Sequence, residues 1–267
     1  MSDFNEAPVR LETSRAGIAY VLLNRPEKHN AFNADIIAQL ADVFETLRGA
    51  DGVRAMFLAA KGGSFSAGGD IDWMRAAGRY TEAENEEDAL ALAEMLRKLY
   101  TLPMLTVALV NGAAMGGALG LIAACDVAVA VKSAKMRFSE VRLGLTPATI
   151  SPYVIEAIGP RQARALFATG ELFDAAHAEK IGLVHYAVED AAELAAMAEK
   201  LADLAMHAAP GAVEDAKRLV RDVAGRPIDH SLSALTAKRI AARRASDEGR
   251  EGLTAFLEKR RPSWLSD

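Results

Sequence analysis

The sequence of 267 residues contains a single cysteine, Cys125, and only 6% aromatic residues. One cysteine excludes an internal disulfide framework and fits a reducing compartment. Because Cys125 lies in an apolar stretch, we interpret it as a buried, inert thiol. Long hydrophobic runs are also lacking. The longest, residues 115–131, is interrupted by Gly120 and Asp126, and so falls short of the ~18 uninterrupted apolar residues of a membrane span.

Several functional motifs are missing as well. The five histidines are scattered, with no HExxH motif and no pairing to cysteine, which argues against zinc. The nucleotide-binding patterns GxGxxG and GxxxxGK(S/T) do not occur. A net charge of −5 argues against a nucleic-acid-binding protein, which usually carries a basic face. Residues 1–10 have no apolar core of a secretory signal. We therefore expect a cytoplasmic protein that binds no metal, no membrane and no nucleic acid.

What is present indicates an α/β core followed by helices. Strands are expected at residues 18–23, 53–59, 106–110, 127–131 and 183–188. Helices alternate with the first of these strands: Asn33 is placed to cap one helix, and residues 81–84 have the spacing of a capping box. Beyond residue 190 the pattern is helical only, with helices expected at 190–207, 212–223, 229–244 and 248–261. This organisation predicts an α/β fold with helix-covered sheets and a helical C-terminal region.

Two glycine-bearing segments stand out in the core. Residues 66–70 (SAGGD) and 111–117 (NGAAMGG) each follow an apolar run typical of a strand, and the second leads into a run typical of a buried helix. Glycines at such junctions leave backbone N–H groups exposed and unpaired. One N–H group from each segment, converging on a carbonyl oxygen, would stabilise an enolate or oxyanion.

With both segments in place, the chain resembles the enoyl-CoA hydratase/isomerase (crotonase) superfamily over nearly its whole length. The resemblance rests on residues 23–31 (LNRPEKHNA), 65–70 (FSAGGD), 111–126, 138–145 (FSEVRLGL) and 251–260 (EGLTAFLEKR). It implies stacked ββα turns in a superhelix, with residues 1–199 as the core for CoA binding and catalysis. Residues 200–267 would be a helical trimerisation region, and the protein a homotrimer or a dimer of trimers.

The family pattern assigns catalytic roles to three residues. The backbone N–H groups of Gly69 and Gly117 would hold the thioester oxygen, and Glu140 would position or deprotonate water. A partly buried Glu140 carboxyl would have a raised pKa, which suits proton transfer near neutrality. The alternative interpretation of Glu140 is a surface salt bridge to Arg137 or Arg142, and that of Gly117 is tight helix packing.

The resemblance also assigns binding roles. Coenzyme A, as part of the substrate and not as a permanent cofactor, would be held around Lys28, His29, Ala31, Ala67, Gly68 and Ile71, with Phe256 and Lys259 reaching a CoA at a neighbouring subunit. Trp73, Met74 and Gly120 are candidates for the acyl pocket, although Trp73 and Met74 are explained equally well by core packing. Asp70 is expected to cap the helix that follows it, and Asp126 to be structural.

One departure from the family concerns Gly120, which stands where two-glutamate hydratases carry their second glutamate. This leaves a one-glutamate hydratase, a double-bond isomerase and a decarboxylase-like enzyme as possibilities, beside a non-catalytic acyl-CoA-binding protein. Residues 70–75, 116–121 and 139–154 resemble bacterial methylglutaconyl-CoA hydratases of leucine and terpenoid breakdown, which also lack that glutamate. We therefore expect a hydro-lyase that adds water to a branched enoyl-CoA. Arg75, Arg79 and Arg142 are candidates to bind a distal carboxylate.

Overall fold

The computed structural model describes residues 7–14 and 16–265. Contacts between residues divide the chain into two compact units, Met1–Lys200 and Leu201–Asp267. Within the described ranges, no helix is both long enough and apolar enough to cross a membrane.

The larger sheet of the first unit is built from the most apolar segments of the chain. Among the described residues it has six strands in the order β1 (Val9–Thr13), β2 (Ile18–Leu23), β3 (Ala55–Ala60), β5 (Leu105–Val110), β7 (Val127–Val131) and β10 (Tyr186–Val188). β1 pairs with β2 in antiparallel fashion, and every other pair is parallel. The side chains of β3, β5 and β7 are largely buried, as expected for parallel strands that are covered on both faces.

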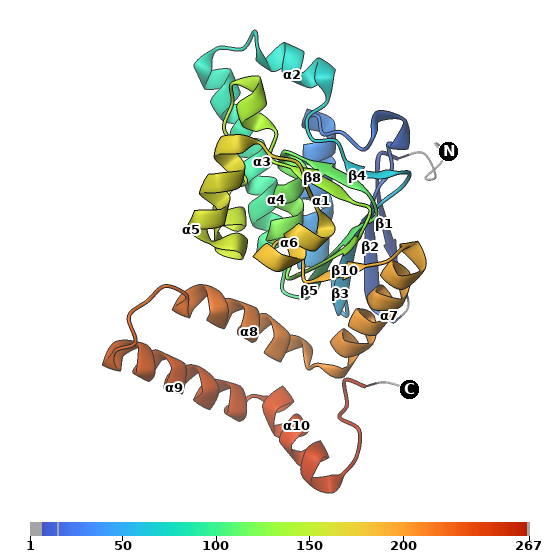
Figure 1. Cartoon of the computed structure of the whole chain (residues 1–267). Coiled ribbons are helices and arrows are strands. Elements are labelled where there is room, and N and C mark those ends of the chain that lie inside the picture. The colour runs from blue at the N-terminus through green and yellow to red at the C-terminus, as the bar shows by residue number, and fades with distance from the viewer. Residues whose placement is uncertain (1–6, 15, 266–267) are drawn as a thin grey trace. The chain divides into compact units, whose positions relative to one another are not determined.

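A second, smaller sheet consists of very short strands. Its order in the described part of the chain is β4 (Ser64–Ser66), β6 (Ala113–Met115), β8 (Lys135–Arg137) and β9 (Phe173–Asp174). β3 continues into β4, β5 into β6, and β7 into β8, so each turn of the chain adds one parallel strand to each sheet (Figure 1). Because a helix follows each such pair of strands, the mixed α/β fold is the stacked ββα arrangement that we expected.

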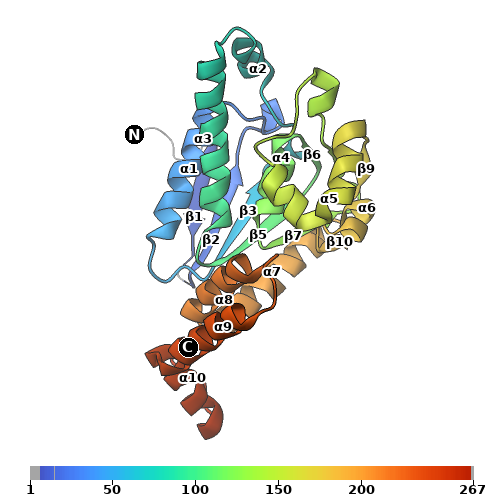
Figure 2. The same cartoon turned by 90° about the vertical axis from the view of Figure 1, so that its left-hand side faces the viewer.

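Several helices of the first unit begin at side-chain caps. They are α1 (Ala34–Arg48), α2 (Ile71–Ala77), α3 (Glu82–Tyr100), α4 (Gly117–Ala124), α5 (Ser151–Thr169) and α6 (Ala175–Ile181). The Asn33 side chain accepts a hydrogen bond from the Ile36 N–H, and Thr81 forms a complete capping box with Glu84. α1 and α3 lie side by side (Figure 2) and bury Phe44 and Leu99 among their contacts. Both expected caps are confirmed.

The chain then becomes helical, as expected. The helices are α7 (Ala191–His207), α8 (Pro210–Val223), α9 (His230–Ala245) and α10 (Asp247–Glu258). α10 ends at Glu258, and the expected extension to residue 261 is wrong. Lys259 adopts a left-handed backbone conformation with φ of 53°, which ends the helix. The Arg260 side chain folds back onto Glu251, with Nη2–Oε2 at 2.8 Å.

Two other expectations need correction. The strand expected at 183–188 is shorter, Tyr186–Val188, because Leu183 follows the left-handed Gly182 and donates a backbone hydrogen bond to Ala178 at the end of α6. Leu183 is buried without being in the sheet. The first glycine segment does not follow β3 directly, since the short strand β4 intervenes; the second follows β5 as expected, but part of it forms the short strand β6. Three-residue strands are too short to produce a recognisable period in the sequence.

Candidate active site

The first glycine segment is held by pairing with residues 29–32. The Ala67 N–H donates to the His29 carbonyl at 2.9 Å, the Phe32 N–H to Gly68 at 2.7 Å, and the Asp70 N–H to Phe32 at 2.7 Å. Gly69 therefore forms a parallel bridge with Phe32 in which its own N–H group points to the opposite side. Among the described residues, the Gly69 N–H has no hydrogen-bond acceptor.

The second glycine segment leads into a helix. Gly116 has φ of 52° and ψ of −123°, and α4 begins at Gly117. The first N–H groups of a helix have no acceptor within it, and they carry the positive end of the helix dipole. A β-carbon on Gly117 would lie 3.4 Å from Phe32 Cδ2, which is an ordinary contact. An alanine would therefore fit at position 117, and the catalytic role of Gly117 remains a prediction.

The two glycine segments are in contact. β4, which ends at the start of the first segment, and β6, which lies within the second, are parallel neighbours with Ser66 opposite Ala114. A β-carbon on Gly68, whose φ is 85°, would lie 2.8 Å from the Met115 carbonyl oxygen. Both the backbone conformation and this close approach require glycine at position 68. The structure thus brings the Gly69 and Gly117 N–H groups to adjoining turns of the chain.

Glu140 lies beside the second segment. It begins the short 3-10 helix Glu140–Leu143 after β8, whose Arg137 carbonyl accepts the Gly116 N–H at 2.9 Å. A β-carbon on Gly116 would lie 3.2 Å from Glu140 Oε1, so the carboxyl abuts the backbone of the glycine segment.

The Glu140 carboxyl is buried and incompletely satisfied. Its Oε2 is buried with no hydrogen-bond partner among the described residues. Desolvation by burial raises the pKa of this carboxyl above its ordinary value. The salt bridge considered from the sequence is absent in the described part of the chain, and the Arg142 Nε instead donates to the Gly170 carbonyl at 3.0 Å. A buried carboxyl that has a free oxygen and is beside backbone N–H donors can exchange protons with a bound molecule.

Gly120 is a point of close packing. It is buried on α4, and a β-carbon there would lie 2.3 Å from Ile150 Cγ2 and 3.3 Å from Leu96 Cδ1. Ile150, at the start of α5, is only 1% exposed. The space into which a second glutamate would extend is thus filled by an isoleucine. A part for Gly120 in lining the acyl pocket remains a prediction.

Trp73 and Met74 lie over the first glycine segment. A β-carbon on Gly69 would lie 3.1 Å from Met74 Cγ and 3.6 Å from Trp73 Cε3. No residue of α2 is fully buried, and Met74 is 36% exposed. Core packing therefore does not account for these two side chains, and their place beside Gly69 fits a role in the acyl pocket.

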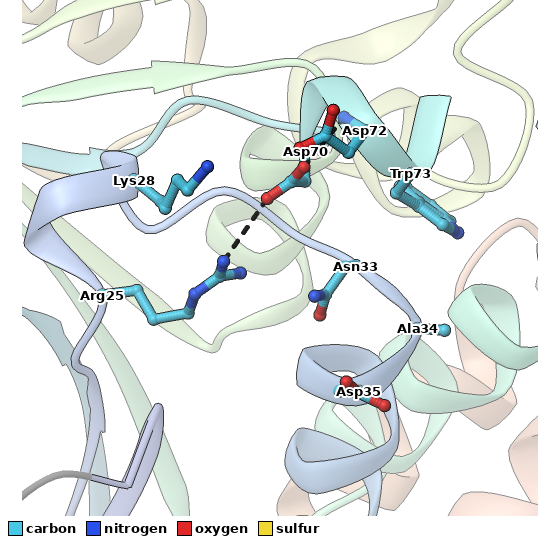
Figure 3. A pocket seen from close by; sticks show the side chains of 8 residues that line it. All are labelled: Arg25, Lys28, Asn33, Ala34, Asp35, Asp70, Asp72 and Trp73. Atoms are coloured by element: carbon cyan, nitrogen blue, oxygen red, sulfur yellow. Dashed lines mark hydrogen bonds and ion pairs between the residues drawn. The ribbon is translucent and has the colours of Figure 1, made fainter. Parts of the chain in front are cut away.

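An open pocket of about 340 Å³ borders the same segment. Figure 3 shows the residues that line it: Arg25, Lys28, Asn33, Ala34, Asp35, Asp70, Asp72 and Trp73. Arg25 Nη2 lies 3.4 Å from Asp70 Oδ2, and the other Asp70 oxygen accepts the Asp72 N–H at 2.9 Å, which confirms Asp70 as a helix cap. The Asp72 N–H, followed by the charges of Arg25 and Lys28, lowers the pKa of Asp70.

Sequence reasoning assigned no roles to Arg25 and Asn30. Arg25 Nη1 donates to the Ala31 carbonyl at 3.3 Å. Asn30 is 3% exposed, with φ of 54°, and its amide donates to the Lys61 and Ser64 carbonyls at 2.9 Å each. The signal in the sequence was the LNRPEKHNA motif. Near its end it contains His29 and Asn30, residue types that tolerate the left-handed backbone conformation, which indicates a turn.

The expected CoA-binding residues fall into two groups. The first group lies around the first glycine segment. Lys28 lines the pocket, Ala31 is buried, and His29 Nδ1 lies 3.3 Å from Ser64 Oγ. Backbone hydrogen bonds between residues 29–32 and 67–70 hold these residues next to Ala67 and Gly68. Ile71, directly after them, is 69% exposed.

Phe256 and Lys259 belong to the C-terminal unit. Phe256 lies on α10 with 80% of its surface exposed, and Lys259 is the left-handed residue that ends this helix. Their part in CoA binding remains a prediction. Asp126, by contrast, is structural as expected: its Oδ2 accepts hydrogen bonds from the Thr106 N–H and hydroxyl at 2.8 and 2.9 Å.

No cluster of three or more histidine, cysteine, aspartate or glutamate side chains that could hold a metal ion is found within the described residues.

Backbone N–H donors at two adjoining turns, with one buried carboxyl beside them, are the kinds of group that an enzyme uses to stabilise an oxyanion and to move a proton. Comparisons with known proteins identify the family. The family model described as "Enoyl-CoA hydratase/isomerase" matches residues 13–267. The chain belongs to this family and is an enzyme of it.

Similar proteins agree with this assignment. The chain is 30% identical to "Crotonyl-CoA hydratase" of Syntrophomonas wolfei, over 93% of this chain and 95% of that protein. It is also 30% identical to "Short-chain-enoyl-CoA hydratase" of Clostridium acetobutylicum, over 91% and 92%. The crystal structure of an enoyl-CoA hydratase from Shewanella pealeana has a TM-score of 0.94 with this chain, at 39% identity over 97% of this chain and 96% of that one.

Proposed function

We propose that this enzyme adds water across the 2,3 double bond of an enoyl-CoA thioester and that Glu140 is its only catalytic carboxyl. The observation that carries the proposal is the Glu140 carboxyl: its Oε2 is buried with no partner among the described residues, and its Oε1 lies beside the backbone of Gly116. A group with a raised pKa and a vacant oxygen is suited to take a proton from water.

In the proposed mechanism, the thioester oxygen accepts hydrogen bonds from the Gly69 and Gly117 N–H groups. Glu140 orients a water molecule and removes its proton as the oxygen attacks C3. Negative charge moves onto the thioester oxygen, where the two donors and the N-terminus of α4 stabilise it. Glu140, or a water molecule, then returns a proton to C2. The loss of one donor from such a site typically costs about 3–4 kcal/mol of transition-state stabilisation.

The proposal places the coenzyme A part of the substrate along residues 28–31 and 67–71. The pocket beside these residues is lined by Arg25 and Lys28 together with Asp35, Asp70 and Asp72 (Figure 3). Arg25 is paired with Asp70, so the Lys28 ammonium is the group proposed to meet a phosphate of coenzyme A. We assign no permanent cofactor. Phe256 and Lys259, on the exposed end of α10, are proposed to reach a CoA bound to another subunit of a homotrimer or a dimer of trimers. Residues 200–267 would form the oligomerisation region of a cytoplasmic protein.

A branched acyl group with a distal carboxylate, as in 3-methylglutaconyl-CoA, is the proposed substrate. The side chains of the three candidate arginines differ in their present contacts. Arg75 forms an ion pair with Asp72 at 2.7 Å, and Arg142 donates to Gly170. The Arg79 side chain has no partner among the described residues, which favours it as the group that receives the carboxylate.

The test is to offer 3-methylglutaconyl-CoA, crotonyl-CoA and a 3-enoyl-CoA separately to the purified protein and to identify the products by mass. A gain of one water on the glutaconyl substrate, lost in Glu140→Gln, supports the proposal. Replacing Arg79 by Gln should then weaken only the glutaconyl reaction, with Arg75→Gln as the matched control.

The second candidate function is double-bond isomerisation, favoured by the single carboxyl. A proton can be moved along an allyl system by one base, and Gly120 supplies no second one. A shifted double bond without a change in mass would assign the enzyme to this reaction instead. Binding without any turnover would favour a non-catalytic acyl-CoA-binding protein.

A further inference from the structure

The short helix α2 is attached to the rest of the core at few points. None of its residues is fully buried, and Ile71 at its start is 69% exposed. Its first turn is capped by Asp70, and Trp73 is partly buried. The Trp73 Nε1–H donates a hydrogen bond to Asp88 Oδ1 on α3 at 3.1 Å. This bond links α2 to α3 through an indole ring.

Asp88 is less exposed to solvent than the residues that precede it on α3. Residues 82–87 of α3 are exposed, whereas Asp88 is partly buried. Among the described residues its carboxylate forms no ion pair, and it accepts a hydrogen bond from the Trp73 indole N–H. The carboxylate is therefore committed to fixing the orientation of this ring.

The other edge of the same ring faces the catalytic segment. Trp73 Cε3 would lie 3.6 Å from a β-carbon on Gly69, whose N–H is a proposed donor to the thioester oxygen. The ring also lines the pocket that contains Lys28 and Arg25 (Figure 3). A rotation of the indole about its side-chain bonds would change the wall beside Gly69, because an aromatic ring is large and rigid.

We propose that Asp88 is a positioning residue for substrate selection. By accepting the indole N–H, it holds Trp73 across the Gly69 side of the acyl site and so determines which acyl chains fit there. This inference rests on the proposed function, because it assumes that a thioester binds beside Gly69. A purely structural tie between α2 and α3 would instead affect all acyl chains equally.

The experiment compares Asp88→Ala, which removes the acceptor, with Asp88→Asn, which keeps a carbonyl oxygen in its place. Trp73→Phe removes the donor and keeps a ring. Glu87→Gln, on the neighbouring exposed position of α3, is the matched control. For each variant, kcat and KM are measured with crotonyl-CoA and with 3-methylglutaconyl-CoA, and Tm is recorded.

We expect Asp88→Ala to change the ratio of the two kcat/KM values by about three- to tenfold, the range of one ordinary hydrogen bond. Trp73→Phe should shift this ratio in the same direction, and the double variant should shift it no further than the larger single change. Asp88→Asn should restore the parent ratio, and Glu87→Gln should leave it unchanged. Equal losses on both substrates in Asp88→Ala and Asp88→Asn, or an unchanged ratio in Asp88→Ala, would overturn the inference.

A readout without turnover separates this inference from the proposed function. The chain has two tryptophans, so in a Trp264→Phe background Trp73 alone reports by fluorescence. Asp88→Ala should change its emission and the ratio of the Kd values for the two thioesters, and Asp88→Asn should restore both. If the parent binds the thioesters but hydrates neither, the proposed function fails while these binding ratios still decide the role of Asp88. No change in emission or in the ratio would refute it.

Discussion

Ile150 occupies the space into which a side chain at position 120 would extend, with its Cγ2 2.3 Å from the position of a β-carbon on Gly120. The contact joins the start of α5 to the middle of α4, and both residues are buried. The space that a glutamate at position 120 would need is thus taken by Ile150, so a single substitution cannot introduce that glutamate without displacing the isoleucine. The absence of a side chain at Gly120 and the presence of Ile150 therefore depend on each other.

The pair predicts strong coupling between two substitutions. Gly120→Glu should lower the free energy of unfolding by more than about 1–3 kcal/mol, because it overpacks the contact and buries a carboxylate. Ile150→Ala alone should cost about 2–5 kcal/mol through the cavity it leaves. The double variant should be less destabilised than the sum of the two. Urea unfolding of all four proteins measures this, and additive losses would contradict the packing explanation.

Replacing Glu140 by Gln should abolish hydration while leaving the fold intact. The carboxylate is the reactive form, and burial raises its pKa, so the rate of the parent enzyme should fall as the pH drops through a value above about 4.3, the ordinary pKa of glutamate. The measurement is kcat/KM against pH, with circular dichroism as a control for folding. A Gln variant that retained the rate and the acid limb would remove Glu140 from the mechanism.

The same substitution should stabilise the protein near neutral pH. A carboxyl with a pKa raised in the folded state binds its proton more tightly when folded than when unfolded. Stability therefore rises as the pH falls through the folded pKa toward the unfolded one, and above both values the buried charge is destabilising. Gln removes that charge. Tm at pH 7 should be higher for Glu140→Gln than for the parent, and the difference should shrink in acid.

Gly68→Ala should disrupt the first glycine segment. Alanine would have to adopt φ of 85°, and its β-carbon would lie 2.8 Å from the Met115 carbonyl oxygen. A stability loss of about 1 kcal/mol or more is expected from the backbone alone, with activity reduced further because Gly69 is displaced. Gly63→Ala is the control, since a β-carbon there meets nothing within 4 Å. Similar behaviour of the two variants in thermal unfolding and turnover would argue against this description.

Asp70 offers a test that separates helix capping from the ion pair with Arg25. Asp70→Asn keeps an oxygen for the Asp72 N–H and removes the charge that faces Arg25, whereas Asp70→Ala removes both. The Ala variant should be less stable than the Asn variant by about 0.5–2 kcal/mol, the usual contribution of a cap. Denaturant unfolding compares them, and equal stability would show that the cap contributes little.

The lowered pKa of Asp70 gives that pair a pH dependence. Stability from the carboxylate is present above the unfolded pKa and is lost as the pH falls through the lower, folded pKa. The advantage of the parent over Asp70→Ala should therefore shrink in acid, which the same unfolding curves at several pH values would reveal.

Local sequence patterns determined much of the fold. Apolar runs located β2 and β7, and the caps at Asn33 and Thr81 located the starts of α1 and α3, because hydrophobic burial and capping act within a few residues of the chain. The helical region after residue 190 followed from the same signals. Short strands such as β4 and β6 escaped detection, since three residues acquire strand geometry only by pairing with distant neighbours.

The candidate site also has features that the sequence revealed and features that only the structure revealed. The sequence by itself identified the glycine segments and Glu140, because the family motifs are contiguous and their residue types are specific. Only the tertiary structure decided that the Glu140 Oε2 is buried without a partner among the described residues, that Ile150 fills the space beside Gly120, and that Asp88 holds Trp73. Each of these features depends on residues from different elements of the chain, and burial, close contact and a shared hydrogen bond exist only once those elements have packed together.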